Sequence, residues 1–110
     1  MERSSRLDRI TDWDIRARKA TYQVKALAHQ CEVSLRQLER YFVHRFRSRP
    51  HVWLNRLRMR EARKLLLKGE MIKQIAPELG FKQVAHFSRE FKRSFGVSPR
   101  LFAQANGKLK

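Results

Sequence analysis

Apolar residues recur at intervals of three and four along most of the chain, which is the spacing of one face of an α-helix. Glycine and proline, which interrupt helices, number only 4 and 3 in 110 residues. No segment alternates apolar and polar residues in the way that predicts a strand. The pattern predicts an all-α protein of about seven helices, at residues 12–20, 22–31, 34–46, 50–68, 71–79, 83–95 and 99–105.

Residues that favour helix ends support these boundaries. Ser34 and Ser98 are good N-caps, because a serine hydroxyl accepts a hydrogen bond from a free backbone N–H group. Pro50 suits the first turn of a helix. Gly69 and Gly96 suit the left-handed residue that commonly follows the last turn.

Two stretches of the chain have similar sequences, which indicates an internal repeat. Residues 24–28 (Val-Lys-Ala-Leu-Ala) match residues 72–76 (Ile-Lys-Gln-Ile-Ala) at an offset of 48. After the next turn the offset becomes 49, and it pairs Leu38 with Phe87, Arg40 with Arg89, Phe42 with Phe91, Phe46 with Phe95, Pro50 with Pro99 and Trp53 with Phe102. A short helix, a tight turn and a longer helix form a helix-turn-helix.

The repeat predicts two helix-turn-helix subdomains, at residues 12–49 and 69–105. A long connecting helix at residues 50–68 joins them, and at about 1.5 Å per residue it spans roughly 27 Å. Residues 1–11 are expected to be a loose polar lead-in, and residues 106–110 a C-terminal tail.

Each longer helix carries a stripe of apolar, mostly aromatic residues: Leu38, Phe42 and Phe46 in the first and Phe87, Phe91 and Phe95 in the second. This aromatic stripe is expected to be buried, which leaves the opposite, polar side of the helix exposed. The predicted exposed residues are Arg36, Glu39, Arg40, Val43 and Arg47 in the first helix, and Ala85, Ser88, Arg89 and Lys92 in the second. The major groove of B-DNA, about 12 Å wide, admits such a helix, and arginine pairs there with guanine. We predict base or phosphate contacts for Arg40 and Arg89, and phosphate contacts for Arg47 and Lys92. The alternative is that these side chains are only solvated.

Charge favours a nucleic-acid partner. The 26 Lys and Arg residues outnumber the 10 Asp and Glu residues, which gives a net charge of +16. Residues 34–110 hold 19 of the basic side chains and only 5 of the acidic ones. Such a field attracts polyanions, nucleic acid first and an anionic membrane surface second. A charge that serves only solubility is a weaker interpretation, because helical solvent faces usually mix both signs.

Other classes of protein fit the sequence poorly. Cys31 is the only cysteine, and with the four histidines it shows no metal-ligand spacing. No glycine-rich phosphate loop occurs, so we predict no catalytic residue, metal site or cofactor and expect no enzyme. No apolar run approaches the ~18 residues of a membrane span, and residues 1–10 do not resemble a signal peptide. We expect a cytoplasmic protein without a membrane partner.

The second unit carries a long motif: Gln74-Ile75-Ala76, then Leu79-Gly80-Phe81, then an unbroken run from His86 to Pro99, and Phe102. This motif closely resembles the C-terminal signature of AraC/XylS-type transcription regulators. The stretch from Leu27 to Pro50 resembles the more variable first helix-turn-helix of the same family. The resemblance covers roughly residues 12–105.

The resemblance implies a bacterial-type, nucleoid-associated regulator whose two recognition helices, about residues 34–46 and 83–95, enter adjacent major-groove segments on one side of the DNA. Base-contacting positions of the family fall on Arg36, Glu39 and Arg40 in the first helix and on Val84, Ala85, Ser88 and Arg89 in the second. Predicted contacts to the DNA backbone are Ser34, Arg47, Lys82, His86 and Lys92. Most full-length relatives also carry an effector-binding or dimerisation domain, so this chain resembles a stand-alone or an excised DNA-binding part.

Three residues depart from the family pattern. Pro77 lies past the first turn of its helix, where proline removes a hydrogen bond at a cost of roughly 3 kcal/mol, so we expect a kink or a later helix start. Glu32 stands where the first turn often has glycine, and a left-handed conformation there would be strained. Glu39 occupies a base-facing position, where it can accept a hydrogen bond from cytosine N4 but also repels phosphate.

These observations predict a transcription regulator that binds double-stranded DNA as a monomer, at an asymmetric site because the two recognition helices differ. The connecting helix falls short of one turn of B-DNA, about 34 Å, so DNA bending is expected. Its residues Arg58, Arg60, Arg63 and Lys64 are expected to form a solvated basic face. The alternative is a basic helical interaction protein that binds RNA polymerase or another protein, with DNA contact secondary. RNA binding is weaker still, because the exposed faces lack aromatic stacking platforms.

Overall fold

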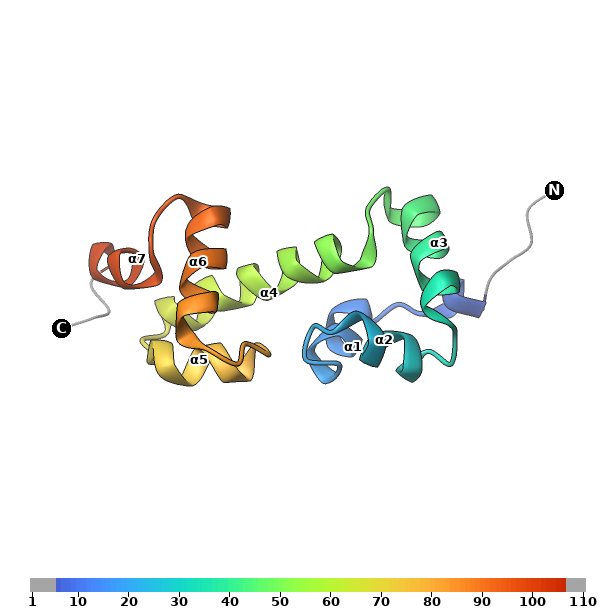
Figure 1. Ribbon diagram of the computed structural model, residues 1–110, viewed down its shortest axis with the longest axis horizontal. Coiled ribbons are helices and arrows are strands. Elements are labelled where there is room, and N and C mark those ends of the chain that lie inside the picture. The colour runs from blue at the N-terminus through green and yellow to red at the C-terminus, as the bar shows by residue number, and fades with distance from the viewer. Residues whose placement is uncertain (1–5, 107–110) are drawn as a thin grey trace. The chain divides into compact units, whose positions relative to one another are not determined.

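The computed structural model describes residues 6–106, which form seven α-helices and one short 3-10 helix and contain no strand (Figure 1). The elements in chain order are η1 (Arg6–Arg9), α1 (Trp13–Lys19), α2 (Val24–Gln30), α3 (Leu35–Phe46), α4 (Pro50–Leu67), α5 (Ile72–Glu78), α6 (Val84–Phe95) and α7 (Pro99–Ala105). Every predicted α-helix is present, with its ends within two residues of the expected ones. The all-α prediction is confirmed.

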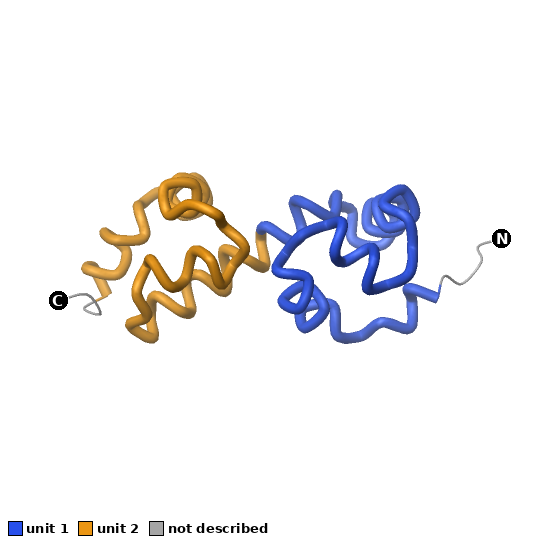
Figure 2. Tube along the Cα trace, turned by 60° about the horizontal axis from the view of Figure 1, so that its bottom comes forward, with its two compact units in different colours: residues 1–55 blue, residues 56–110 orange. Residues whose placement is uncertain are grey.

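The chain divides into two compact units, residues 1–55 and 56–110, and the division falls inside α4 (Figure 2). The repeat seen in the sequence is also a repeat of structure. Helices α2 and α5 are seven residues long and start 48 residues apart, whereas α3 and α6 are twelve residues long and start 49 residues apart. Each unit therefore contains a helix-turn-helix, α2–α3 in unit 1 and α5–α6 in unit 2.

The turn between the two helices starts in the same way in both units. The backbone N–H of Val33 donates to the carbonyl of Ala28 over 3.1 Å, and the N–H of Phe81 donates to the carbonyl of Ala76 over 2.9 Å. These bonds from a residue to the one five before it are typical of a helix that ends in a left-handed residue. The turn of unit 2 is one residue longer before its next helix begins, which is why the offset changes from 48 to 49.

The aromatic stripe of each longer helix forms the core of its unit, as predicted. In unit 1 the ring centroid of Phe42 lies 5.0 Å from that of Trp13, 4.9 Å from that of Phe46 and 5.2 Å from that of Trp53. In unit 2 the centroid of Phe91 lies 5.9, 4.6 and 5.6 Å from those of Phe87, Phe95 and Phe102. Edge-to-face pairs of this kind add about 0.5–1.5 kcal/mol each to the energy of burial.

The prediction of a loose lead-in over residues 1–11 is wrong for its described part. Residues 6–9 form η1, and Leu7 is only 3% exposed. The hydroxyl of Tyr41 on α3 donates to the carboxylate of Asp8 over 2.8 Å, and the guanidinium of Arg6 donates to the backbone carbonyl of Glu32. A single apolar anchor gives no periodic signal, so the sequence pattern missed it. Residues 1–5 of the lead-in, and residues 107–110 of the expected tail, lie outside the described residues.

Pro77 neither delays the start of its helix nor ends it. Helix α5 begins at Ile72, five residues before the proline, and continues to Glu78. Since α5 is only seven residues long, Pro77 interrupts the hydrogen bonding of its last turn alone. The carbonyl of Pro77 is bonded all the same, because it accepts a hydrogen bond from the N–H of Gly80 over 3.0 Å.

Unit 1 has charged residues in left-handed conformations where unit 2 has glycine. Glu32 has φ 58° in the first turn, and its counterpart Gly80 has φ 87°. Arg47 has φ 56° at the end of α3, and its counterpart Gly96 has φ 81°. For a residue with a Cβ atom, this conformation costs about 1–2 kcal/mol of folding free energy. The left-handed conformation considered for Glu32 is present, and Arg47, Thr21 and Tyr22 adopt it as well.

We predict that Glu32→Gly raises the free energy of unfolding of unit 1 by about 1 kcal/mol, because glycine adopts positive φ without a Cβ clash. Both tryptophans, Trp13 and Trp53, lie in unit 1, so urea unfolding followed by tryptophan fluorescence reports on this unit. Glu32→Ala is the matched control, since it removes the same carboxylate but keeps the Cβ atom. Equal stabilisation by both substitutions would contradict a backbone origin.

Candidate nucleic-acid interface

Helix α3 presents a polar side that faces away from its buried stripe. Leu38 and Phe42 are fully buried. Arg36, Glu39 and Arg40, which are predicted to contact bases, are all exposed. Val43, predicted only to face outward, and Arg47, predicted to contact phosphate and placed directly after α3, are exposed as well. They recur at intervals of three and four, so they share one side of the helix. The structure therefore brings the predicted residues of the first recognition helix together on one accessible surface.

The start of α3 is held by a capping box. The hydroxyl oxygen of Ser34 accepts a hydrogen bond from the backbone N–H of Gln37 over 3.1 Å, and the Gln37 side chain accepts one from the N–H of Ser34 over 2.8 Å. Two N–H groups that would otherwise lack partners are thus bonded within the chain. Ser34 is exposed but already has this structural role, and a contact of its hydroxyl with DNA stays a prediction.

Glu39 has a charged partner on the segment that follows α3. Its carboxylate oxygen lies 3.8 Å from Nε of Arg49, and both side chains are more than half exposed. An exposed pair of this kind contributes little to stability, about 0–1 kcal/mol. The guanidinium of Arg49 offsets the negative charge of Glu39. It therefore reduces the repulsion between this carboxylate and a nearby phosphate. Sequence analysis did not find Arg49, since no helical spacing links it to Glu39.

Helix α6 repeats this arrangement with different side chains. Ala85, Arg89 and Lys92 are exposed, Ser88 is half-buried, and Phe87 and Phe91 are fully buried on the other side. Arg89 thus occupies the position in α6 that Arg40 occupies in α3.

Val84, also predicted to contact bases, is 41% exposed and has an apolar environment within unit 2. It lines a pocket of about 320 Å³ together with Leu66, Met71, Ile72 and Ala103, next to Glu70 and Lys73. Val84 is thus exposed like Ala85 and Arg89 on the same helix, but it borders this apolar pocket.

Two predicted backbone-contacting residues flank the start of α6. Lys82 is exposed in the turn, and His86 is exposed in the first turn of the helix. The imidazole of His86 packs edge-on against Phe81, with ring centroids 5.1 Å apart. Gln83, the N-cap of α6, makes no side-chain hydrogen bond to the helix, unlike Ser34 of α3.

The predicted solvated basic face of α4 is wrong for Arg58. Its guanidinium lies over the ring of Phe81, 4.0 Å from the centroid. Arg63 lies over Phe95 at 5.3 Å, although its side chain remains exposed. Arg60 and Lys64 are exposed, as expected. Helical periodicity separates the sides of α4, but it does not show that an aromatic ring from the turn before α6 packs against Arg58.

No helix within residues 6–106 is long and apolar enough to cross a membrane. Within the same range, no three histidine, cysteine, aspartate or glutamate side chains gather in a way that suits a metal ion.

Known proteins resemble this chain in sequence and in structure. A family model described as a helix-turn-helix domain matches residues 27–105. Over 76 residues, 68% of this chain, the sequence is 42% identical to the HTH-type transcriptional activator RhaS of Escherichia coli, and it spans only 27% of that relative's length.

Two crystal structures show the same fold. A transcriptional regulator with an AraC-type DNA-binding domain from Chromobacterium violaceum is 28% identical, with a TM-score of 0.69 over 84% of this chain and 88% of that one. The C-terminal domain of the response regulator yesN from Fusobacterium nucleatum is 24% identical, with a TM-score of 0.73 over 83% of this chain and 92% of that one. At that identity, the second likeness concerns the fold alone.

We predict that Arg58→Gln lowers the free energy of unfolding of unit 2 by about 1–2 kcal/mol, because it removes a partly buried cation–π contact and the packing of the arginine stem. Thermal unfolding followed by circular dichroism measures the effect. Arg60→Gln, at an exposed position of the same helix, is expected to change the stability by less than about 0.5 kcal/mol. Equal effects of the two substitutions would contradict a structural role for Arg58.

Proposed function

Because this chain belongs to the family of AraC-type helix-turn-helix DNA-binding domains, we propose that it binds double-stranded DNA sequence-specifically and regulates transcription. One observation carries the proposal above the others. Arg40 and Arg89 are exposed at equivalent positions of two twelve-residue helices whose opposite sides are buried in aromatic cores. A helix with one side anchored and an arginine on the other is suited to reading guanine in the major groove.

The proposal gives the two recognition helices different tasks. In α3, Arg36 and Arg40 donate to base edges, and Glu39 accepts from cytosine or is held by Arg49. In α6, Arg89 donates to a base, while the small Ala85 and Ser88 allow the helix to approach the base pairs closely. Val84, which is exposed beside the apolar pocket of unit 2, contributes an apolar contact at the edge of this surface.

Contacts to the DNA backbone position the two helices. We assign this role to exposed residues at the ends and sides of the recognition helices, namely Ser34, Arg47, Lys82, His86 and Lys92. Such contacts set the register of a protein on DNA without reading its sequence. Since α4 is one unbroken helix of 18 residues, we infer that it joins two readers of a single asymmetric site, and that a monomer suffices.

The family consists of DNA-binding transcription regulators and not of enzymes. We infer that this chain has no catalytic activity and that it acts on DNA in the cytoplasm of a bacterium. An effect on transcription requires that the bound chain help or hinder RNA polymerase, and the placement of the site decides which. The other interpretation, a basic protein that binds RNA polymerase and contacts DNA secondarily, has no support from the relatives.

Selection from random duplexes tests sequence reading directly. We expect a defined asymmetric site, and we expect Arg40→Ala and Arg89→Ala to lose discrimination at different base pairs, each by about 1–3 kcal/mol. Arg18→Ala, an exposed arginine of α1, is the charge-matched control and should retain the preference. If all three variants bind DNA slightly more weakly but keep the same sequence preference, the chain is a general polyanion binder and the proposal fails.

The dependence of binding on salt gives a second test. Each phosphate contact contributes a slope of about −0.9 to log affinity against log salt, so six or more contacts predict a slope near −5 or steeper. Fluorescence anisotropy with a labelled duplex at four or five salt concentrations measures it. A slope near zero would contradict DNA binding through contacts between basic side chains and phosphate groups.

A further inference from the structure

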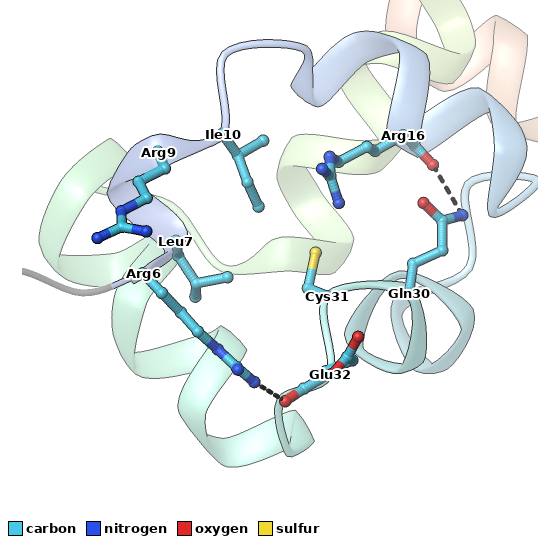
Figure 3. A pocket seen from close by; sticks show the side chains of 8 residues that line it. All are labelled: Arg6, Leu7, Arg9, Ile10, Arg16, Gln30, Cys31 and Glu32. Carbon is cyan, nitrogen blue, oxygen red and sulfur yellow. Dashed lines mark hydrogen bonds between the residues drawn. The ribbon is translucent and has the colours of Figure 1, made fainter.

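Unit 1 contains a pocket that lies apart from the proposed reading surface. Its volume is about 270 Å³, on the order of nine water molecules at about 30 Å³ each. The walls come from η1 and the residue after it, from α1, from the end of α2 and from the turn before α3, namely Arg6, Leu7, Arg9, Ile10, Arg16, Gln30, Cys31 and Glu32 (Figure 3). No residue of α3 lines it.

The charge of the pocket is predominantly positive. Three arginines line it against one carboxylate, that of Glu32. Asp12, beside the pocket, accepts a hydrogen bond from Nε of Arg16 over 3.0 Å, and this bond lowers the pKa of the Asp12 carboxyl. The bond uses Nε, and the guanidinium also interacts with the Cys31 thiol, so the four N–H groups on its two terminal nitrogens serve Cys31 and any ligand. Those nitrogens form a fork that suits a carboxylate or a phosphate group.

The remaining wall is apolar except for Gln30, whose side-chain amide donates to the backbone carbonyl of Arg16 over 3.3 Å. Leu7 and Cys31 are buried and Ile10 is half-buried, and Figure 3 shows the side chains of Ile10, Arg16 and Cys31 converging on the same space. Burial raises the pKa of the Cys31 thiol, so the thiol stays protonated at neutral pH. The neutral thiol interacts with the Arg16 guanidinium and otherwise offers a small, weakly polar surface, and it is not a reactive nucleophile.

From this combination of charge and shape we propose that the pocket binds a small organic anion, whose carboxylate or phosphate group meets Arg16 and Arg6 and whose short apolar part contacts Leu7, Ile10 and Cys31. A DNA phosphate carries the same charge but no apolar part, and it leaves this wall unused. The bound anion would link η1 and α1 to the turn before α3, because Arg6 also donates to the carbonyl of Glu32. The inference does not depend on DNA binding.

Sodium butyrate is the probe, and the amide signals of Ile10, Gln30 and Cys31 in NMR spectra of the full 110-residue chain are the readout. At constant ionic strength we expect saturable shifts with butyrate and none with butyramide, which has the same shape without the charge. Inorganic phosphate should bind more weakly, since it lacks the apolar part. Equal shifts with butyrate and sodium chloride would overturn the proposal.

Substitutions locate the site. We expect Arg16→Gln to raise the dissociation constant for butyrate about tenfold or more, the loss typical of one charge-assisted bond. Arg18→Gln, on the same helix but outside the pocket, should change it less than twofold. Arg6→Gln provides a second test that leaves the pair of Asp12 and Arg16 intact, and it should weaken binding several-fold. Unchanged binding in both Arg6→Gln and Arg16→Gln would overturn the proposal.

A titration with DNA distinguishes a small organic anion from a DNA phosphate as the ligand of the pocket. A short DNA duplex is added to the same labelled chain, with and without saturating butyrate. We expect the butyrate-induced shifts at Ile10 and Cys31 to persist in the presence of the duplex. If only the duplex moves these signals and butyrate does not, the pocket is a contact for the DNA backbone and the proposal is wrong.

Discussion

The burial of one aromatic stripe on each longer helix constrains the rest of the structure. Phe42 in α3 and Phe91 in α6 are fully buried, and they contact four and three other aromatic rings of their own units. Once those rings are inside, helical geometry determines which residues face outward. Arg40 and Arg89 are exposed for this reason, so the aromatic cores and the candidate reading surfaces have the same origin.

The two units share this packing but differ in how their helices end. Unit 2 ends its helices α5 and α6 with glycine in left-handed conformations, whereas unit 1 has Glu32 and Arg47 there. Unit 1 gains compensating contacts that unit 2 does not repeat, because η1 contributes buried Leu7 and the hydrogen bond between Tyr41 and Asp8. The pocket with Arg16 and Cys31 arises at the same place, between η1 and the turn. The less regular unit therefore also carries the additional binding site that we propose.

Most of the fold was predictable from the sequence because its signals are local. Ser34, Pro50, Gly69 and Ser98 mark helix ends, and repeated phenylalanines mark the buried side, so the helices were predicted within two residues. The features that were missed all depend on contacts between distant segments. Leu7 is buried by elements that follow it, Arg58 lies over an aromatic ring more than twenty residues later in the chain, and Arg49 meets Glu39 without a helical spacing. Helical spacing predicted which candidate residues lie on exposed sides of α3 and α6, whereas the half-buried position of Ser88 and the apolar pocket beside exposed Val84 required the structure.

The central claim is that α3 and α6 read two segments of the same duplex, and the spacing of those segments tests it most directly. Five base pairs, about half a turn of B-DNA, are inserted between the two segments that the chain protects in a footprint of its selected site. The account predicts that affinity falls close to the value for unrelated DNA, since only one helix can then reach its bases, and that protection of one segment disappears. Unchanged affinity and protection of both segments after the insertion would contradict it.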